Sequence, residues 1–171
     1  MSKLSLLIAI PVKRSLHPAL KARARALADA ALADARNLAL FDMRLAWQED
    51  DGPGEPQPGR WGRQAWARNE LLRAHLQEDD DYVFMVDADL TDYPADLPAQ
   101  LYEANPDGIT APMVLIEGSK QFYDTLGFIQ NGRRLVYLPP YFHGVNGQDL
   151  VDLDAVGCVY LAPADVLRKT P

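Results

Sequence analysis

Residues 82–89 read YVFMVDAD, an apolar run that ends directly in two aspartates spaced one residue apart. Five consecutive apolar residues followed at once by a polar turn predict a short strand that is buried on both faces, as in a parallel sheet. Residues 4–10, LSLLIAI, form a longer run of the same kind, which stops at Pro11. The two runs therefore predict two buried strands of one sheet.

Helical and extended patterns alternate on either side of these two runs. Further strands are expected at residues 38–47, 108–116, 135–138 and 156–162, and helices at 18–37, 64–77, 94–104 and 163–169. Such alternation is typical of an α/β sandwich with a mostly parallel sheet. Residues 48–62 hold three prolines and four glycines, which predicts a long loop and a candidate lid or binding loop.

Length and composition limit the possible classes of protein. A chain of 171 residues with 48% hydrophobic and 24% charged residues is typical of one globular domain, expected to span residues 1–171. The net charge of −7 provides no basic surface for duplex DNA or an anionic membrane. The single cysteine, Cys158, excludes an internal disulfide and a cysteine-cluster metal site. No apolar run approaches the ~20 residues that cross a bilayer, so we expect a cytoplasmic protein without a membrane span.

Asp87 and Asp89 are the strongest candidates for binding chemistry. A buried strand runs directly into them, and ligands of open α/β sheets bind outside the carboxyl ends of the strands. Two neighbouring carboxylates repel each other unless a cation lies between them. A hard divalent ion, held by carboxylates and substrate phosphates, is the usual partner. The alternative is that one aspartate caps the following turn and the other is solvated.

Arg68 and Asn69 lie in the helix expected before this strand. The arginine is suited to a phosphate or to one of the aspartates, and the asparagine to a sugar or base. The alternative is an exposed polar pair without a ligand. The sequence contains neither GxGxxG after the first strand nor GxxxxGK[ST], which argues against a dinucleotide fold and a P-loop. Its three histidines are scattered, which argues against a zinc site.

Six segments occur in an order that resembles a known family: IPVKR (10–14), ARN (67–69), DYVFMVDADL (81–90), ITAPMV (109–114), FYDTLGF (122–128) and DAVGCVYLAPADVL (154–167). This succession resembles the GT-A class of nucleotide-sugar glycosyltransferases, and its middle is most similar to the fungal mannan-polymerase and family-2-like enzymes. The resemblance covers nearly the whole chain. It implies a single Rossmann-like α/β/α domain that transfers a sugar from a UDP- or GDP-linked donor to an acceptor hydroxyl.

The resemblance also implies roles for individual residues. Asp87 and Asp89 match the pair that holds Mn²⁺ or Mg²⁺ against the donor diphosphate. The residues implied to bind the donor are Pro11, Val12, Asp42, Arg68, Asn69 and Asp87. Those implied on the acceptor side are Tyr123, Asp124 and Gly157.

An inverting mechanism is preferred, and it needs a base for the acceptor hydroxyl. In the family that group usually follows the Val-Gly strand, a region that this chain is expected to lack. Asp152 and Asp154 are the nearest substitutes and are the candidate catalytic residues. Two alternatives stay open. One is a nucleotide-sugar-binding subunit without turnover, completed by a second copy or a partner chain. The other is a nucleotidyltransferase, which the absence of a glycine-rich loop after the first strand disfavours.

Overall fold

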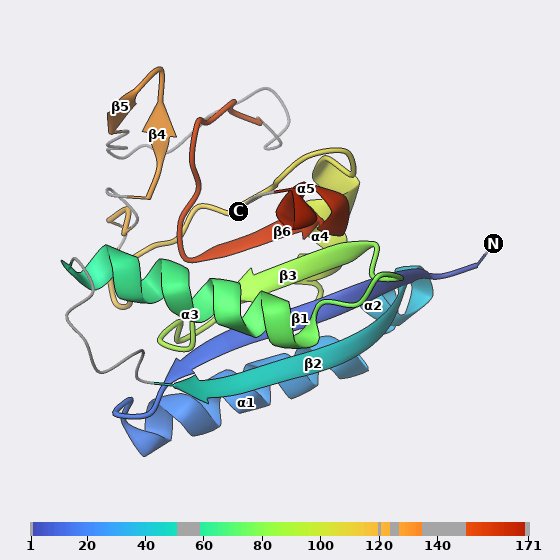
Figure 1. The fold of residues 1–171 in the computed structure, drawn as a ribbon, viewed down its shortest axis with the longest axis horizontal. Coiled ribbons are helices and arrows are strands. Elements are labelled where there is room, and N and C mark those ends of the chain that lie inside the picture. The colour runs from blue at the N-terminus through green and yellow to red at the C-terminus, as the bar shows by residue number, and fades with distance from the viewer. Residues whose placement is uncertain (1, 51–58, 120, 124–126, 135–149, 170–171) are drawn as a thin grey trace.

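A four-stranded sheet forms the centre of the protein (Figure 1). The structure is a computed structural model that describes residues 2–50, 59–119, 121–123, 127–134 and 150–169. The strand order is β2 (Phe41–Asp50), β1 (Leu4–Lys13), β3 (Tyr82–Val86) and β6 (Val159–Pro163). β1 pairs in parallel with both β2 and β3, whereas β6 runs antiparallel to β3. The expected α/β class with a mostly parallel sheet is therefore confirmed.

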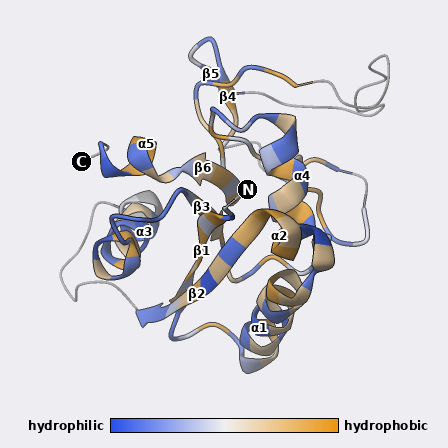
Figure 2. Cartoon of the chain, turned by 90° about the vertical axis from the view of Figure 1, so that its right-hand side faces the viewer, coloured by the Kyte–Doolittle hydropathy of each residue, from blue (hydrophilic) through white to orange (hydrophobic). Residues whose placement is uncertain are grey.

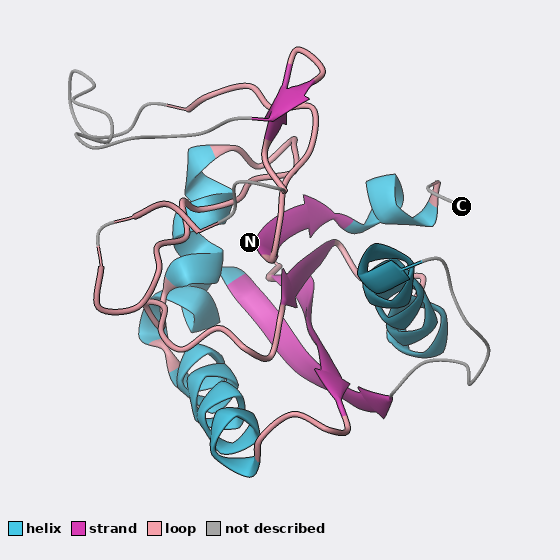
Figure 3. Ribbon diagram, turned by 90° about the vertical axis from the view of Figure 1, so that its left-hand side faces the viewer, coloured by secondary structure: helices cyan, strands magenta, loops and turns pink. Residues whose placement is uncertain are grey.

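Helices cover both faces of this sheet, as Figures 2 and 3 show from opposite sides. On one face lie α1 (Pro18–Ala33), α2 (Ala35–Leu40) and α4 (Leu97–Ala104). On the other lie α3 (Gly59–His75) and the short α5 (Ala164–Arg168). A second, two-stranded sheet consists of β4 (Ile129–Gln130) and β5 (Arg133–Arg134). The main sheet thus forms the middle layer of three.

The side chains of β1 explain why its sequence is apolar without alternation. Leu6, Ile8 and Ile10 pack toward α1, and Leu7 and Ala9 pack toward α3. All five are completely buried. A strand with helices on both faces has no side that water reaches, so each position favours an apolar residue. The two apolar runs predicted as buried strands are confirmed.

Residues 108–116 do not form the strand that we predicted. Thr110 makes one isolated bridge to Leu161 of β6, with both backbone hydrogen bonds at 2.8 Å, and Leu115 makes another to Phe122. Pro112 interrupts this segment and cannot donate to a strand ladder. The segment therefore meets the outer edge of β6 without continuing the sheet.

The predicted helix at residues 18–37 is two helices. Asp34 is extended (φ −69°, ψ 132°) and its carboxylate accepts the backbone N–H of Arg36 and of Asn37, which starts α2. Because α2 continues to Leu40, the second strand begins at Phe41 and not at residue 38.

The loop predicted at 48–62 is wrong at both ends of that range. β2 runs to Asp50 because an edge strand tolerates polar residues, and α3 already begins at Gly59. Residues 51–58, like the predicted strand at 135–138, lie outside the described residues.

Candidate functional site

A pocket of about 420 Å³ lies at the carboxyl ends of β1, β2 and β3. The chain passes from β1 to β2 on one side and then to β3 on the other, so the strand order reverses between β1 and β3. In open α/β sheets a crevice opens at this reversal and binds ligands. We call the cavity the strand-end pocket. Its charged lining residues are Lys13, Asp50, Arg63, Arg68, Asp87 and Asp89.

The two aspartates belong to a tight turn that follows β3. The N–H of Leu90 donates to the carbonyl of Asp87 over 3.2 Å, and aspartate is favoured at the first position of such a turn. The N–H of Asp87 donates to the carbonyl of Cys158 over 2.9 Å and continues the pairing of β3 with β6. The Asp87 side chain is only 16% exposed, whereas Asp89 is exposed to solvent. The turn therefore presents two carboxylates in different surroundings.

Arg68 reaches Asp87 from α3. Its Nη2 donates to both carboxylate oxygens of Asp87, over 2.8 and 2.9 Å. The Arg68 side chain is 22% exposed, and its Nε is buried without a hydrogen-bond partner in the described part of the chain. Burial by itself lowers the pKa of Arg68, but the charge and hydrogen bonds of Asp87 outweigh it and raise that pKa above its usual range. Arg68 thus remains a cation inside the pocket wall.

Tyr160 of β6 shares this environment. Burial raises the pKa of its phenol, the charge of Arg68 opposes that shift, and the charge of Asp87 adds to it. The phenol therefore stays neutral at physiological pH. The formal charges that line the pocket balance, with Lys13, Arg63 and Arg68 against Asp50, Asp87 and Asp89. Such a lining suits a ligand that carries both anionic and hydroxyl groups.

The structure brings together five of the predicted donor-side and metal-binding residues. Pro11, Val12, Arg68, Asp87 and Asp89 all line the strand-end pocket. Pro11 is tolerated in β1 because β1 pairs with β3 only as far as Ala9, so that only β2 lies beside it there. The predicted donor-binding residue Asn69 is not among the lining residues, although its neighbour Arg68 is.

Asp42, which we predicted to bind the donor, is not among the residues that line the strand-end pocket. It lies at the amino-terminal end of β2, opposite Ser5, with its carboxylate 3.7 Å from Lys3 Nζ. The acid of β2 that lines the pocket is Asp50. Seven residues of extended strand lie between the two aspartates, and the eight steps from one to the other span about 26 Å. The sequence analysis does not identify Asp50 because the polar end of β2 resembles a loop. The feature that could have identified it is its position at the carboxyl end of a parallel strand.

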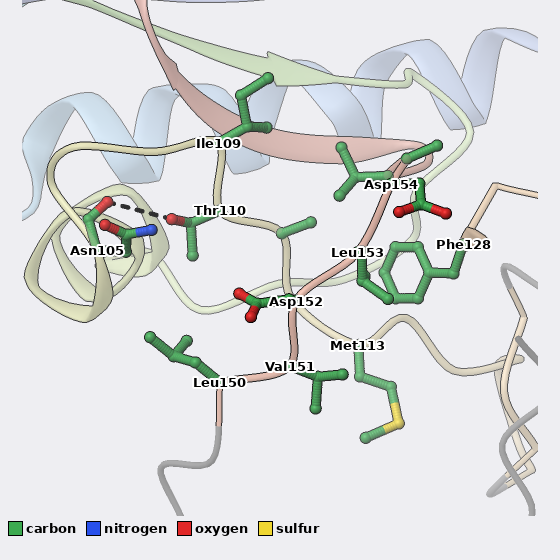
Figure 4. Close-up of a pocket in the computed structure, with 13 residues that line it drawn as sticks. Asn105, Ile109, Thr110, Met113, Phe128, Leu150, Val151, Asp152, Leu153 and Asp154 are labelled. Carbon is green, nitrogen blue, oxygen red and sulfur yellow. Dashed lines mark hydrogen bonds between the residues drawn. The ribbon is translucent and has the colours of Figure 1, made fainter. Parts of the chain in front are cut away.

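Asp152 and Asp154 lie in a different cavity, of about 390 Å³, whose lining also includes Asn105, Thr110 and Phe128 (Figure 4). This cavity shares no lining residue with the strand-end pocket. Asp154 Oδ2 accepts the N–H of Gly132 over 2.7 Å, and Gln130 Nε2 donates to the carbonyl of Asp152 over 2.9 Å. The two candidate catalytic residues therefore do not line the cavity that Asp87 and Asp89 line.

Of the three predicted acceptor-side residues, the structure describes Gly157 and Tyr123. Gly157 precedes Cys158, whose carbonyl meets the N–H of Asp87, and so lies near the turn after β3. Tyr123 is 46% exposed and donates its N–H to the carbonyl of Val114 over 2.9 Å. Asp124 lies outside the described residues.

Within the described residues, no three histidine, cysteine, aspartate or glutamate side chains come together as a potential metal site. None of the described helices is both long enough and apolar enough to cross a membrane. A scan against models of known protein families found no match, and searches of curated proteins and of solved structures found none either.

Proposed function

We propose that this protein is a metal-dependent glycosyltransferase that uses a UDP- or GDP-linked sugar as donor. The observation that carries the proposal is the position of the strand-end pocket. It gathers the turn after β3, the end of β1 and Arg68 of α3 at the reversal of strand order. These residues also include most of those that the family resemblance implies for donor binding. The pocket volume falls within the roughly 300–1,000 Å³ of pockets that hold small organic ligands.

Each part of a nucleoside diphosphate finds suitable chemistry in this lining. Lys13, Arg63 and Arg68 offer cationic donors to the diphosphate. Pro11 and Val12 offer an apolar contact to the base, and the carboxylate of Asp50 is suited to accept a hydrogen bond from a ribose hydroxyl.

The turn after β3 fits a cation that is shared with the substrate. Mg²⁺ is usually held by one or two protein carboxylates together with substrate phosphates, and Asp87 and Asp89 supply two carboxylates on one turn. Mn²⁺ or Mg²⁺ bound there would neutralise charge on the leaving diphosphate as a Lewis acid. Because the described residues offer no third acidic, histidine or cysteine ligand, such a site would depend on the diphosphate for the rest of its coordination.

A second candidate function is nucleotide-sugar binding without turnover. One observation favours it: the candidate bases Asp152 and Asp154 line the second cavity and not the strand-end pocket. Transfer would then need a base supplied by another part of the chain or by a partner. Binding and turnover must therefore be measured separately.

Calorimetric titration tests donor binding directly. UDP, GDP and their sugars are titrated into the wild-type protein with and without Mn²⁺. We expect one nucleotide to bind in the presence of Mn²⁺, and the Asp89→Ala variant to bind it at least about tenfold more weakly, since a charged contact contributes about 1.5–3 kcal/mol. Asp42→Ala is the matched control, because it removes the same side chain at the amino-terminal end of β2, at the end of the sheet opposite the pocket.

Absence of binding by every nucleotide, with or without Mn²⁺, would contradict the proposal. If a nucleotide-sugar binds, its hydrolysis and its transfer to added acceptors are followed by release of the nucleoside diphosphate. Release supports the enzyme, whereas binding without release supports the second candidate function.

A further inference from the structure

Arg68 occupies the side of Asp87 that a chelated metal ion would use. One nitrogen, Nη2, lies 2.8 Å from Oδ1 and 2.9 Å from Oδ2 of Asp87. A divalent cation that binds a carboxylate in bidentate fashion takes this same position between the two oxygens. Arg68 and such a cation would therefore compete for Asp87, by occupancy and by repulsion of like charges.

The position of Arg68 leaves part of its hydrogen-bonding capacity unused. Its Nε is buried and has no partner in the described part of the chain. A buried unpaired donor is unfavourable, so this arrangement depends on the ion pair with Asp87. A diphosphate presents several anionic oxygens, which suit the planar, multiply donating guanidinium better than a contact through one nitrogen. A diphosphate in the pocket would thus offer Arg68 an alternative partner.

We propose that Arg68 is a positioning residue that keeps Asp87 from binding a divalent cation until a diphosphate engages the guanidinium. Asp89 is then the only carboxylate of the turn open to a cation in the nucleotide-free protein. Cation and nucleotide would bind together, and each would raise the affinity of the other by the same factor. The role of the diphosphate rests on the function proposed above, whereas the competition for Asp87 rests on the observed contact.

Binding of Mn²⁺ alone tests this competition without any nucleotide. Free Mn²⁺ is counted by electron paramagnetic resonance during titration of the wild type, Arg68→Gln and Arg68→Met. Both neutral variants should bind Mn²⁺ about tenfold or more tightly than the wild type, within the usual range of coupling between sites. Arg73→Gln is the matched control. It removes the same charge from an exposed position of the same helix, where Arg73 pairs with Glu70, and should leave Mn²⁺ affinity unchanged.

Two further variants show where the ion binds. In the double variant Arg68→Gln/Asp87→Asn the gain in affinity should disappear, because the second carboxylate is gone. In the otherwise wild-type protein, Asp87→Asn alone should weaken Mn²⁺ binding without nucleotide by less than Asp89→Ala does, because Arg68 already occupies Asp87 whereas Asp89 is exposed. This second measurement does not depend on the folding of either neutral Arg68 variant.

Specific results would overturn the proposal. One is unchanged or weaker Mn²⁺ binding by folded Arg68→Gln and Arg68→Met. Another is a gain in affinity that survives Asp87→Asn in the double variant. A third is a loss of Mn²⁺ binding in the single variant Asp87→Asn that equals or exceeds the loss in Asp89→Ala. Circular dichroism verifies that each variant is folded. If no nucleotide binds the wild type, the proposed function fails but the result for Mn²⁺ alone still decides whether Arg68 competes for Asp87.

Discussion

Tyr93 carries a buried polar atom that the sequence gives no reason to expect. Its ring packs edge-on against Phe84 of β3 with the centroids 5.9 Å apart, and its hydroxyl is buried without a hydrogen-bond partner in the described part of the chain. Burial raises the pKa of this phenol from 10.0 to about 12. The ring therefore supports the core while the hydroxyl weakens it.

The substitution Tyr93→Phe should stabilise the protein by about 1 kcal/mol, because it removes the unpaired hydroxyl and keeps the ring. It should also change the response to alkali. In the wild type the phenol ionises near pH 10 when unfolded but near pH 12 when folded, so stability falls as the pH rises through this window. Urea unfolding at pH 8 and pH 11 measures both effects. A loss of stability at pH 8, or an equally steep fall above pH 10 in the variant, would contradict this prediction.

The two aspartates of the turn should differ in their effect on stability. Asp87→Ala leaves Arg68 as a partly buried cation without its partner, which should cost about 1–3 kcal/mol. Asp89 is exposed, so Asp89→Ala should change stability by less than about 0.5 kcal/mol. Thermal and urea denaturation of both variants compares them. Equal stabilities would show that the pair of Arg68 with Asp87 contributes little to the fold, so that binding defects of both variants could be compared directly.

At the scale of elements, Asn37 joins three helices. Its side chain is completely buried, and Nδ2 donates to the carbonyls of Ala31 and Ala95 while Oδ1 accepts the N–H of Ala99. These hydrogen bonds connect α2, through Asn37, to the end of α1 and to the start of α4. The break between α1 and α2 at Asp34 precedes this residue and places it among these helices.

Asn37→Ala should destabilise the protein by about 2–4 kcal/mol, since the Ala95 carbonyl and the Ala99 N–H lose their partner and the Ala31 carbonyl keeps only the N–H of Asp34. Arg36→Ala, one residue earlier, removes exposed ion pairs to Asp96 and Glu103 and should have little effect. Equilibrium unfolding in urea measures both variants. If Asn37→Ala were as harmless as Arg36→Ala, water would have to replace the lost hydrogen bonds.

Local composition predicts the wrong structure for two segments of the chain, residues 108–116 and the end of β2. Residues 108–116 have an apolar composition suited to a strand, yet Pro112 prevents continuous pairing, and four large apolar side chains there are exposed: Ile109, Met113, Leu115 and Ile116. The polar residues at the end of β2 predict a loop, yet they continue the strand to Asp50. An edge strand needs only one partner, so its composition says little about whether it is paired.

At the scale of the whole molecule, the two ends of the sheet differ in structure. The carboxyl end opens into the strand-end pocket, whereas the amino end is closed by a buried acid. Asp80 accepts hydrogen bonds from the Arg44 guanidinium, the Ser5 hydroxyl and the N–H of Gln77, and its side chain is fully buried. Arg168 of α5 donates to the carbonyls of residues 77, 78 and 80. This network connects α3, β2 and α5 at the end opposite the candidate site.

Asp80→Ala should therefore destabilise the protein by about 3–5 kcal/mol, because it removes the carboxylate that accepts from the Arg44 guanidinium, the Ser5 hydroxyl and the Gln77 N–H. The double variant Asp80→Ala/Arg44→Met should recover part of this loss, since no unpaired charge remains. Folded Asp80→Ala should bind nucleotide like the wild type. Chemical denaturation and calorimetry on the same samples separate the two properties, and a selective loss of nucleotide affinity in a folded variant would contradict the division between the two ends.

The sequence by itself determined the α/β class, the two central buried strands and the acid pair that follows β3. Each of these depends on a local property, namely continuous apolar character and a polar turn directly after it. Only the tertiary structure decided that Asp50 and not Asp42 reaches the pocket, that Arg68 contacts Asp87, and that Asp152 and Asp154 lie elsewhere. These facts depend on strand order and on contacts between residues distant in the chain, which the pattern of neighbouring residues does not encode.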